Sequence, residues 1–511
     1  MSKQKITDED ALSFHLEPTP GKFEISATVP MTTQRDLSLA YSPGVAVPCL
    51  AIAENPELAY DYTNKGNLVA VISNGTAVLG LGNLGALGSK PVMEGKAVLF
   101  KRFADVNSID IELDTEDPDA FCNAVRLMGP TFGGINLEDI KAPECFIIEQ
   151  RLKEEMDIPV FHDDQHGTAV ICAAGLLNAL HLSGKKIEDV KIVLNGAGAA
   201  GIACIELLKS MGAKHSNCVV CDTKGVIYQG RTEGMNQWKS AHAITTELRT
   251  LDEAMKGADV FLGVSVKGAV TQDMVISMAD NPVIFAMANP DPEITPEEAH
   301  EVRADAIVAT GRSDYPNQVN NVLGFPYLFR GALDIHARAI NDEMKIACAH
   351  ALANLAREDV PDEVALAYGK NLAFGRDYII PTPFDPRLIH RIPPAVARAG
   401  MKTGVARRPI IDMDAYELSL KTRMDPTASI LRGINARARS AQARMIFAEG
   451  DDPRVLRAAV MYQRNGLGKA LVVGRSNDVK AKLEEAGLGD AFRELEIVNA
   501  ANTQHLSVYK D

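Results

Sequence analysis

The stretch from Lys191 to Asp222, KIVLNGAGAAGIACIELLKSMGAKHSNCVVCD, decides the fold class. A short apolar run leads through a glycine-rich turn into a segment with apolar residues at helical spacing, and a second apolar run follows. This order predicts a strand, a helix and a second, parallel strand. The turn matches the pattern GxGxxG, and its residues are predicted to bind a dinucleotide: Gly196, Ala197, Gly198, Ala199, Ala200 and Gly201.

The residue types in this turn match the needs of a bound pyrophosphate. The glycines allow a tight turn and a close approach of the backbone, and the following helix directs its N-terminus at the anion. Asp222 ends the second strand about 20 residues after the last glycine, near the spacing of an acid that binds a ribose hydroxyl. That acid alone favours NAD, but it is followed by Thr223 and Lys224, and Arg231 and Lys239 could reach a 2′-phosphate. We therefore expect NADP in preference to NAD.

Strand-like and helix-like segments alternate on both sides of this unit. Short apolar runs lie at Val260–Val264, Val283–Ala288 and Ala306–Ala309, with helix-compatible segments between them. Apolar helices are expected at Thr168–Leu182 and Glu343–Arg357. Repeated alternation of this kind predicts an α/β fold with a doubly wound, Rossmann-type parallel sheet covered on both faces.

A length of 511 residues allows roughly three domains. We expect a substrate and metal domain at residues 1–165, an NAD(P)-binding Rossmann-type domain at 166–380, and a proline-punctuated linker and wrapping segment at 381–425. Residues 426–511 begin a further α/β domain with a strand, a helix and a strand. A single strand–helix–strand unit leaves sheet edges and one face of the sheet uncovered. The segment is therefore too short for a whole domain of this kind, and we expect the chain to be part of a longer protein.

Composition argues against several classes of protein. Lys and Arg total 53 against 67 Asp and Glu, a formal net charge of −14, so a nucleic-acid partner is not expected. The start of the chain and its apolar stretches predict neither a signal peptide nor a membrane span, and we expect a cytoplasmic protein. The 8 cysteines are too sparse for a disulfide scaffold. Cys218 and Cys221 lie three apart on a strand and point to opposite faces, which argues against a metal or redox pair.

Two acidic pairs form a second constellation. Glu138 and Asp139 lie in INLEDI, and Asp163 and Asp164 lie in FHDDQHG. Neighbouring carboxylates converge at strand ends and turns, and such oxygen ligands favour Mg²⁺ or Mn²⁺ over Zn²⁺. Two solvated acidic turns are the alternative. The two histidines of HDDQH would form a zinc pair only on a helix, and a glycine follows them directly.

Two further side chains, Lys96 and Tyr41, are candidates for proton transfer. Lys96 in MEGKAVLFK lies among apolar and small residues, where burial is expected to lower its pKa and make it usable as a base. A surface lysine with a buried stem is the alternative. Tyr41 in LAYSPGVA is on its own equally compatible with a half-buried core aromatic.

Seven motifs occur along the chain in the order seen in malic enzymes: YSPGVA, LGLGNLG followed by MEGK, NLED, FHDDQHGTA, NGAGAAG, FAMANPDPEI and NQVNNVLGFP. The sequence resembles the bacterial hybrid type, in which a malic enzyme precedes a phosphotransacetylase-like domain. The malic part covers about residues 15–425, and RMIFAEGDDPRVLRAA resembles the start of a phosphotransacetylase. Several motifs in one order make this resemblance more specific than any single motif.

The resemblance implies metal-dependent oxidative decarboxylation of L-malate to pyruvate and CO₂, with reduction of NADP⁺ or NAD⁺. By motif, Glu138, Asp139 and Asp164 would be the ligands of Mg²⁺ or Mn²⁺. Lys96, oriented by Asp163, would take the hydroxyl proton of the substrate. The cation would stabilise the enolate that remains after CO₂ has left.

The same resemblance implies the remaining site residues. Tyr41 would protonate the enolate carbon, and Asn289 and Asn321 would hold the substrate, Asn289 also contacting the nicotinamide. Larger malic enzymes carry a carboxylate-binding arginine just before LGLG, where this chain has Ala77. The group that replaces this arginine is left open by the sequence.

Partners follow from the resemblance as well. A homo-oligomer is implied, a dimer or higher and up to a hexamer for the full-length hybrid, with acetyl-CoA as an effector of the full-length chain. Two alternatives remain at this point: another NAD(P)-dependent dehydrogenase, of the amino-acid or folate type, and an acyl-CoA-binding protein or acyltransferase. Loss of activity in a chelator would distinguish a malic enzyme from the first alternative, and the second needs the rest of the C-terminal domain.

Overall fold

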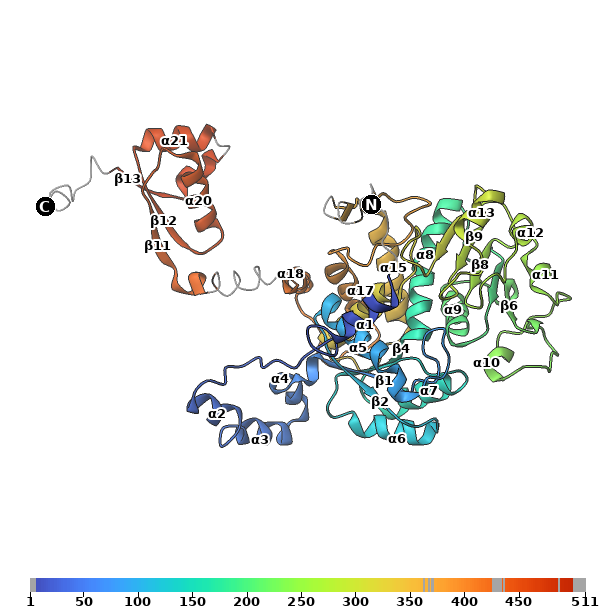
Figure 1. The fold of residues 1–511 in the computed structure, drawn as a ribbon. Coiled ribbons are helices and arrows are strands. Elements are labelled where there is room, and N and C mark those ends of the chain that lie inside the picture. Colours follow the sequence, from blue (N-terminus) through green and yellow to red (C-terminus); the bar gives the residue numbers. More distant parts are fainter. Residues whose placement is uncertain are drawn as a thin grey trace. The chain divides into compact units, whose positions relative to one another are not determined.

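The computed structural model describes residues 6–361, 364–365, 368, 372–424, 434, 437–485 and 488–499. The chain forms two compact units, residues 1–421 and 422–511 (Figure 1). Their structure confirms the predicted α/β fold class, while the bounds of the four segments expected from the sequence stay predictions.

The first sheet has four parallel strands in the order β2-β1-β3-β4. Both faces of its two central strands, β1 and β3, are buried, because α6 and α7 cover one face of the sheet and α5 and α14 cover the other. The strands are β1 (Leu68–Ser73), β2 (Asn107–Glu112), β3 (Gly134–Leu137) and β4 (Val160–His162). The helices up to the end of this sheet are α1 (Asp8–Leu16), α2 (Gln34–Ala40), α3 (Ala46–Glu54), α4 (Ala59–Tyr62), α5 (Gly85–Ala104), α6 (Pro118–Met128) and α7 (Glu144–Glu155), with short 3₁₀ turns at Pro56–Leu58 and Asn64–Asn67.

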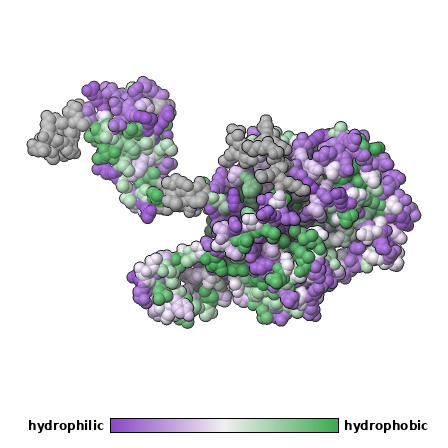
Figure 2. Space-filling view, in the orientation of Figure 1, coloured by the Kyte–Doolittle hydropathy of each residue, from purple (hydrophilic) through white to green (hydrophobic). Residues whose placement is uncertain are grey.

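Helices α2 and α3 project from the rest of the first unit and bury none of their residues within the chain (Figure 1). Helix α2 begins with an ordinary capping signal, because Thr33 accepts a hydrogen bond from the Asp36 backbone N–H, whereas no side chain caps α3. Apolar side chains such as Leu39, Val47 and Leu50 remain exposed on them. In Figure 2, hydrophobic surface interrupts the hydrophilic surface in this part of the molecule.

The second sheet has six strands in the order β10-β9-β8-β5-β6-β7. All neighbours are parallel except the last pair, in which β7 runs antiparallel to β6. The chain order reverses between β5 and β8, which makes the carboxyl ends of these two strands the expected ligand crevice of a doubly wound sheet. The strands are β5 (Ile192–Asn195), β6 (Cys218–Asp222), β7 (Gly225–Val226), β8 (Val260–Gly263), β9 (Val283–Ala286) and β10 (Ile307–Thr310).

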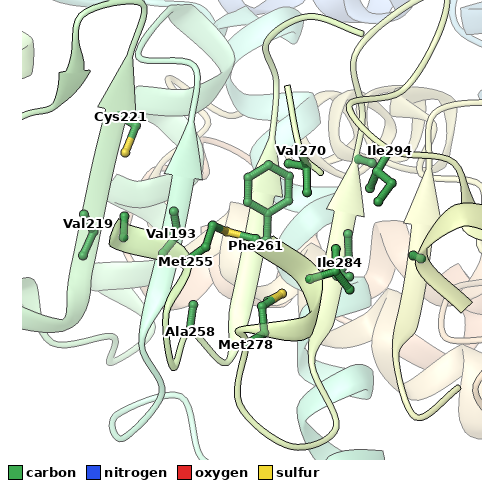
Figure 3. Packing of buried hydrophobic residues seen from close by; sticks show 14 of the residues in the cluster. Val193, Val219, Cys221, Met255, Ala258, Phe261, Val270, Met278, Ile284 and Ile294 are labelled. Atoms are coloured by element: carbon green, nitrogen blue, oxygen red, sulfur yellow. The ribbon is translucent and has the colours of Figure 1, made fainter. Parts of the chain in front are cut away.

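Helices cover both faces of this second sheet. Residues of α11, α12 and α13 contribute to the core on one face, where Figure 3 shows Val193, Met255, Phe261 and Ile284 among the packed side chains. Helices α8 and α9 pack on the opposite face. The helices of this region are α8 (Thr168–Ser183), α9 (Ala199–Ser210), α10 (Gln237–Ser240), α11 (Leu251–Met255), α12 (Gln272–Ile276) and α13 (Pro296–Val302), with a 3₁₀ turn at His215–Asn217.

Two short turns and the helices that follow them connect the two sheets of the first unit. A π-helical turn, η3 (Asp163–Gly167), leads into α8, and a 3₁₀ turn, η5 (Asn321–Leu323), leads into the helices that follow the second sheet. These are α14 (Phe325–Asp334), α15 (Asp342–Arg357), α17 (Leu388–Lys402) and α18 (Met413–Arg423).

Helix α17 lies within the stretch that we expected to be a linker and wrapping segment. It contains Pro393 and Pro394, which remove two backbone donors from a helix interior. Its apolar residues, among them Leu388, Ile392 and Val396, are buried at helical spacing against α14 and α15. Burial of this face therefore outweighs the helix-breaking tendency of the two prolines.

The second unit has a three-stranded parallel sheet in the order β11-β12-β13. Residues of α20, β12 and α21 form its small core, with Leu456, Val460, Val472 and Leu483 buried. Strand β11 is mostly exposed. The elements are β11 (Ala443–Phe447), α20 (Pro453–Arg464), β12 (Gly468–Val473), α21 (Ser476–Glu485), the 3₁₀ turn η6 (Gly489–Arg493) and β13 (Glu496–Val498). None of the helices in the described parts of either unit is long and apolar enough to cross a membrane.

Candidate active site

The two acidic pairs meet at one edge of the first sheet. Glu138 and Asp139 directly follow β3, and Asp163 and Asp164 directly follow β4. Because β3 and β4 are adjacent parallel strands, their carboxyl ends lie at the same edge. Ligand oxygens of Glu138, Asp139 and Asp164 all lie within 4.8 Å of one another. The sequence prediction that these three carboxylates converge therefore agrees with the geometry.

This group of three carboxylates has the features of a divalent cation site. The Oδ2 atom of Asp139 is buried without a hydrogen-bond partner, and the Asp139 backbone N–H donates to Asp164 Oδ2 at 2.8 Å. Asp139 has a φ of 53°, a left-handed conformation that non-glycine residues adopt at strained, often functional, positions. Burial and the neighbouring Asp164 raise the pKa of Asp139 to about 7, and burial raises the pKa of Glu138 well above its usual range. A cation would relieve this crowding, and the all-oxygen donor set suits Mg²⁺ or Mn²⁺.

Lys96 lies beside this group on α5. Its Nζ is 2.7 Å from Asp163 Oδ2 and 2.8 Å from Glu138 Oε1, and its side chain is largely buried, with 11% exposed. Burial alone would lower the pKa of Lys96, but the negative charges of Asp163 and Glu138 hold that pKa well above its usual range. The expectation of a lowered pKa was therefore wrong, because the two carboxylates in contact with the ammonium group outweigh the effect of burial.

Asn321 joins the same cluster from the other side. It begins η5, and its Nδ2 donates to Asp163 Oδ2 at 3.1 Å. Thr168 Oγ1 in turn donates to Asn321 Oδ1 at 3.3 Å, which fixes the orientation of the amide. The Asp163 carboxylate therefore receives hydrogen bonds from both Lys96 and Asn321, residues more than two hundred positions apart in the chain.

Asn289 lies three residues after β9, near the ligand crevice of the second sheet. A Cβ atom on Gly80 would lie 2.9 Å from the Asn289 carbonyl oxygen, so the LGLG loop of the first region touches the ANP segment of the second. The neighbouring Ala288 backbone N–H donates to Glu293, a fully buried carboxylate that also accepts from the Ser265 N–H and Oγ. Glu293 thereby ties together the loops that follow β8 and β9.

The glycine-rich turn connects β5 to α9 as the sequence predicts. Gly196 has a φ of +115°, and a Cβ there would lie 2.4 Å from the Val264 carbonyl oxygen. A Cβ on Gly201 would lie 1.9 Å from the Gly196 carbonyl oxygen, so helix and turn pack without room for a side chain. Nothing lies within 4 Å of a Cβ on Gly198. This open position, directly before the N-terminus of α9, leaves room for a phosphate group.

The end of β6 carries more charge than a ribose site needs. Both Asp222 carboxylate oxygens accept from Arg231 Nη2, at 2.7 and 2.9 Å, and Lys239 Nζ donates to Asp222 Oδ2 at 2.7 Å. Burial alone would raise the pKa of Asp222. The hydrogen bonds from Lys239 and Arg231 outweigh burial and lower that pKa below its usual value. One acid and two bases therefore lie together where the adenosine ribose of a dinucleotide would bind.

Comparison with known families places nearly the whole chain. Residues 20–153 match the malic enzyme N-terminal domain, residues 165–368 match the malic enzyme NAD-binding domain, and residues 429–511 match phosphate acetyl/butaryl transferase. The crystal structure of malic enzyme from Pyrococcus horikoshii Ot3 is 42% identical, with a TM-score of 0.76, and the match covers 84% of this chain and 98% of that one.

The chain belongs to the malic enzyme family.

Two curated relatives of this malic enzyme come from Rhizobium meliloti. One, named NADP-dependent malic enzyme, is 65% identical over 507 residues, which cover 99% of this chain and 67% of the relative. The other, named NAD-dependent malic enzyme, is 55% identical over 483 residues, which cover 94% of this chain and 63% of the relative. The chain thus spans about two thirds of the length of these relatives. The resemblance to the hybrid type is confirmed, since both malic enzyme domains and the transferase family match in order.

Tyr41 is the one predicted site residue that lies apart. It follows α2, and 71% of its surface is exposed. Among the described residues, no hydrogen bond joins the Tyr41 side chain to Lys96 or to the carboxylates. The role of Tyr41 in this malic enzyme therefore stays a prediction.

The position of the absent arginine is beside the carboxylates. The Ala77 backbone N–H donates to the Asp139 carbonyl oxygen at 3.0 Å, so a longer side chain at this position would start beside Asp139.

Glu149 and Glu293 are among the buried carboxylates that sequence reasoning missed. Glu149 lies on the buried face of α7 with Phe146 and Leu152, and a charged residue in such an apolar pattern is the signal that could have revealed it. Glu293 stands in the ANPDPEI motif, but its partner Ser265 lies on a loop 28 positions away in the chain, and no local pattern indicates that pairing.

Proposed function

We propose that this malic enzyme catalyses the oxidative decarboxylation of L-malate to pyruvate and CO₂ with reduction of NADP⁺. The observation that carries the proposal is the meeting of three carboxylates with the Lys96–Asp163 pair at one sheet edge. Asn321 joins this cluster from the region that follows the second sheet. A hydride acceptor in the crevice of that sheet and a substrate held at the carboxylates would thus face each other.

Glu138, Asp139 and Asp164 would hold the divalent cation, Mg²⁺ or Mn²⁺. When bound, the cation supplies Lewis-acid stabilisation of the negative charge that develops on the substrate oxygen as CO₂ leaves. The requirement for this metal is part of the proposal, and the unpaired Asp139 oxygen and the raised pKa of Asp139, about 7, support it.

Lys96 and Asp163 provide the route for the hydroxyl proton. Transfer of one ammonium proton from Lys96 to Asp163, across their 2.7 Å hydrogen bond, leaves a neutral amine and a neutral acid. The amine then accepts the proton of the malate hydroxyl, while the carbon that bears this hydroxyl transfers a hydride to the nicotinamide. Asn321 holds Asp163 in place through its amide, and Tyr41 returns a proton to the enolate carbon in this proposal.

The charges around Asp222 support NADP over NAD. Arg231 and Lys239 would bind the 2′-phosphate, and Asp222 would hold the two cations in position instead of binding a ribose hydroxyl. The relative named NADP-dependent is also the more similar of the two from Rhizobium meliloti. Asn289 and the turn from Gly196 to Gly201 complete the proposed dinucleotide site.

An NADP⁺ reduction assay with L-malate tests the proposal. Activity should require Mn²⁺ or Mg²⁺, disappear in a chelator and return when either cation is added in excess. NAD⁺ should be the poorer acceptor. Malate-dependent reduction that persists in the chelator would contradict the metal site.

Assembly and regulation form a further part of the proposal. We infer a homo-oligomer, because α2 and α3 expose Leu39, Val47 and Leu50 and bury nothing within their own chain. The match of residues 429–511 to an acyl-phosphate transferase family supports acetyl-CoA as an effector of the full-length protein. A cytoplasmic location fits the 8 free cysteines, which are stable as thiols in a reducing compartment.

A further inference from the structure

Glu149 is a buried carboxylate that none of the roles above uses. It lies on α7, is 5% exposed, and shares the buried face of that helix with four apolar residues, Cys145, Phe146, Ile148 and Leu152. An ionised acid in such surroundings is costly unless its oxygens are fully paired. The partners of Glu149 therefore indicate what it is retained for.

Both oxygens of Glu149 bind the segment that carries the two aspartates. Glu149 Oε1 accepts from the His162 backbone N–H at 3.0 Å and lies 2.8 Å from Lys153 Nζ. Glu149 Oε2 lies 2.9 Å from His166 Nε2. One carboxylate thus holds the residue just before Asp163 and the residue just after Gln165.

The held segment has an uncommon backbone conformation. Residues Asp163–Gly167 form a single π-helical turn, a conformation that is rare and occurs frequently at functional sites. No side chain caps the start of this turn, so the hydrogen bond from the His162 N–H to Glu149 is an anchor at that end. Asp163 and Asp164 project from the turn toward Lys96 and Asp139.

A second contact holds the turn from the opposite direction. His166 Nδ1 lies 3.3 Å from Lys345 Nζ on α15, and Lys345 pairs with Asp342 at 2.6 Å. His166 therefore lies between Glu149 and Lys345. In this arrangement Nε2 donates to the Glu149 carboxylate, and Nδ1 accepts from the Lys345 ammonium group. Removal of the Glu149 charge would leave His166 and Lys153 without their anionic partner.

We propose that Glu149 is a positioning residue for the metal site: its carboxylate fixes the turn from His162 to His166, and thereby the placement of Asp164 as a ligand and Asp163 as the partner of Lys96. This inference rests on the proposed function, because it assigns Glu149 a role toward the proposed cation. Partners that orient metal ligands affect metal affinity by about 10–100-fold when they are removed.

Glu149→Gln in the full chain tests this role, because it keeps the shape of the side chain and removes its charge. Mn²⁺ binding is measured directly by isothermal titration calorimetry and by electron paramagnetic resonance, without substrate. We expect the Mn²⁺ Kd to rise by about 10–100-fold. NADPH binding should be unchanged, and kcat at saturating Mn²⁺ should fall less than the metal affinity does.

Glu154→Gln is the matched control on the same helix, since Glu154 is exposed and its carboxylate accepts only from Gln150 among the described residues. Its Mn²⁺ Kd should equal that of the wild type. Glu149→Asp, which keeps the charge on a shorter stem, should recover part of the lost affinity, which a purely structural role would not require.

Two results would overturn the inference: a folded Glu149→Gln protein with wild-type Mn²⁺ affinity, or equal losses in Glu149→Gln and Glu154→Gln. If Glu149→Gln does not fold, His166→Leu removes one end of the anchor alone, and it should weaken Mn²⁺ binding; unchanged binding would contradict the role of Glu149. A wild-type chain that binds no Mn²⁺ would overturn the proposed function itself, and the positioning role with it.

Discussion

At the scale of single residues, the proposed base Lys96 is held by two carboxylates, Asp163 and Glu138, at 2.7 and 2.8 Å. The MEGK motif selects the lysine, but the direction of its pKa shift depends on two carboxylates that approach it only in the fold. Asp163 and Glu138 are 67 and 42 positions away in the chain, so no local pattern indicates that they contact the ammonium group. The identity of a site residue is therefore more predictable than its electrostatic surroundings.

Lys96→Ala removes the proposed base while the glycine-rich turn stays intact. We expect kcat for malate oxidation to fall by about 10²–10⁴-fold, the usual contribution of a general base. NADPH binding, followed by its fluorescence, should remain at the wild-type level. Turnover close to that of the wild type would assign the base to another residue.

Arg231 and Lys239 are expected to set the preference for NADP⁺. Each makes a charge-assisted contact, so Arg231→Ala or Lys239→Ala should raise the KM for NADP⁺ by about 10–100-fold and leave the KM for NAD⁺ much less affected. Lys224→Ala is the control, because Lys224 is exposed and pairs with Glu233. An equal effect on both coenzymes would place the 2′-phosphate elsewhere.

His166 should make the stability of the first unit sensitive to acid. Burial is the main cause that lowers the pKa of His166 from 6.5 to about 4. Between these values the unfolded chain binds more protons than the folded one, so the free energy of unfolding falls as the pH is lowered, by at most about 1.4 kcal/mol for each pH unit. Urea unfolding at two pH values within this window should show a smaller loss for His166→Gln than for the wild type. Equal losses would contradict the neutral, buried state of His166.

At the scale of elements, hydrophobic periodicity predicts most of the second sheet. The three apolar runs that follow the first strand–helix–strand unit contain β8 and β9 and overlap β10, and the expected apolar helix before it is α8. Helix α17 was harder to foresee, because its two prolines favour a linker and only tertiary burial of residues such as Ile392 favours a helix. Local sequence signals fail where packing overrides propensity.

Helix α10 connects the proposed coenzyme site to the helices that cover the first sheet. Its Trp238, the one tryptophan of the chain, stacks on Phe146 of α7 with ring centroids 4.9 Å apart, and the next residue, Lys239, pairs with Asp222. Because Trp238 lies beside the proposed 2′-phosphate site, NADPH binding should quench its fluorescence. Trp238→Phe should keep the stacking, whereas Trp238→Ala should lower the free energy of unfolding by about 1–3 kcal/mol. Fluorescence that does not respond to saturating NADPH would place the coenzyme away from α10.

At the scale of the whole molecule, the two compact units separate the proposed chemistry from the proposed regulation. Every residue proposed for the metal, base and coenzyme sites lies in the unit that ends at residue 421. The second unit has its own small core and its own sheet. The sequence indicated the start of this second α/β unit from one strand–helix–strand pattern, whereas the extent of each unit depends on long-range contacts.

A chain that ends at residue 421 should therefore keep malate oxidation with a kcat close to that of the wild type. Any response to acetyl-CoA should be absent from it, because the part that matches the transferase family has been removed. Steady-state assays with and without acetyl-CoA measure both properties. Loss of activity in a truncated protein that still unfolds cooperatively would show that the second unit contributes to the active site.

The proposed chemistry couples oxidation to decarboxylation at the carboxylate cluster, so both products must form together. NADPH and pyruvate should be quantified together after incubation of the full chain with L-malate, NADP⁺ and Mn²⁺, and compared with Asp164→Asn, which removes one proposed ligand. We predict equal amounts of NADPH and pyruvate from the wild type and neither product from the variant. NADPH that forms without pyruvate, or a variant as active as the wild type, would contradict it.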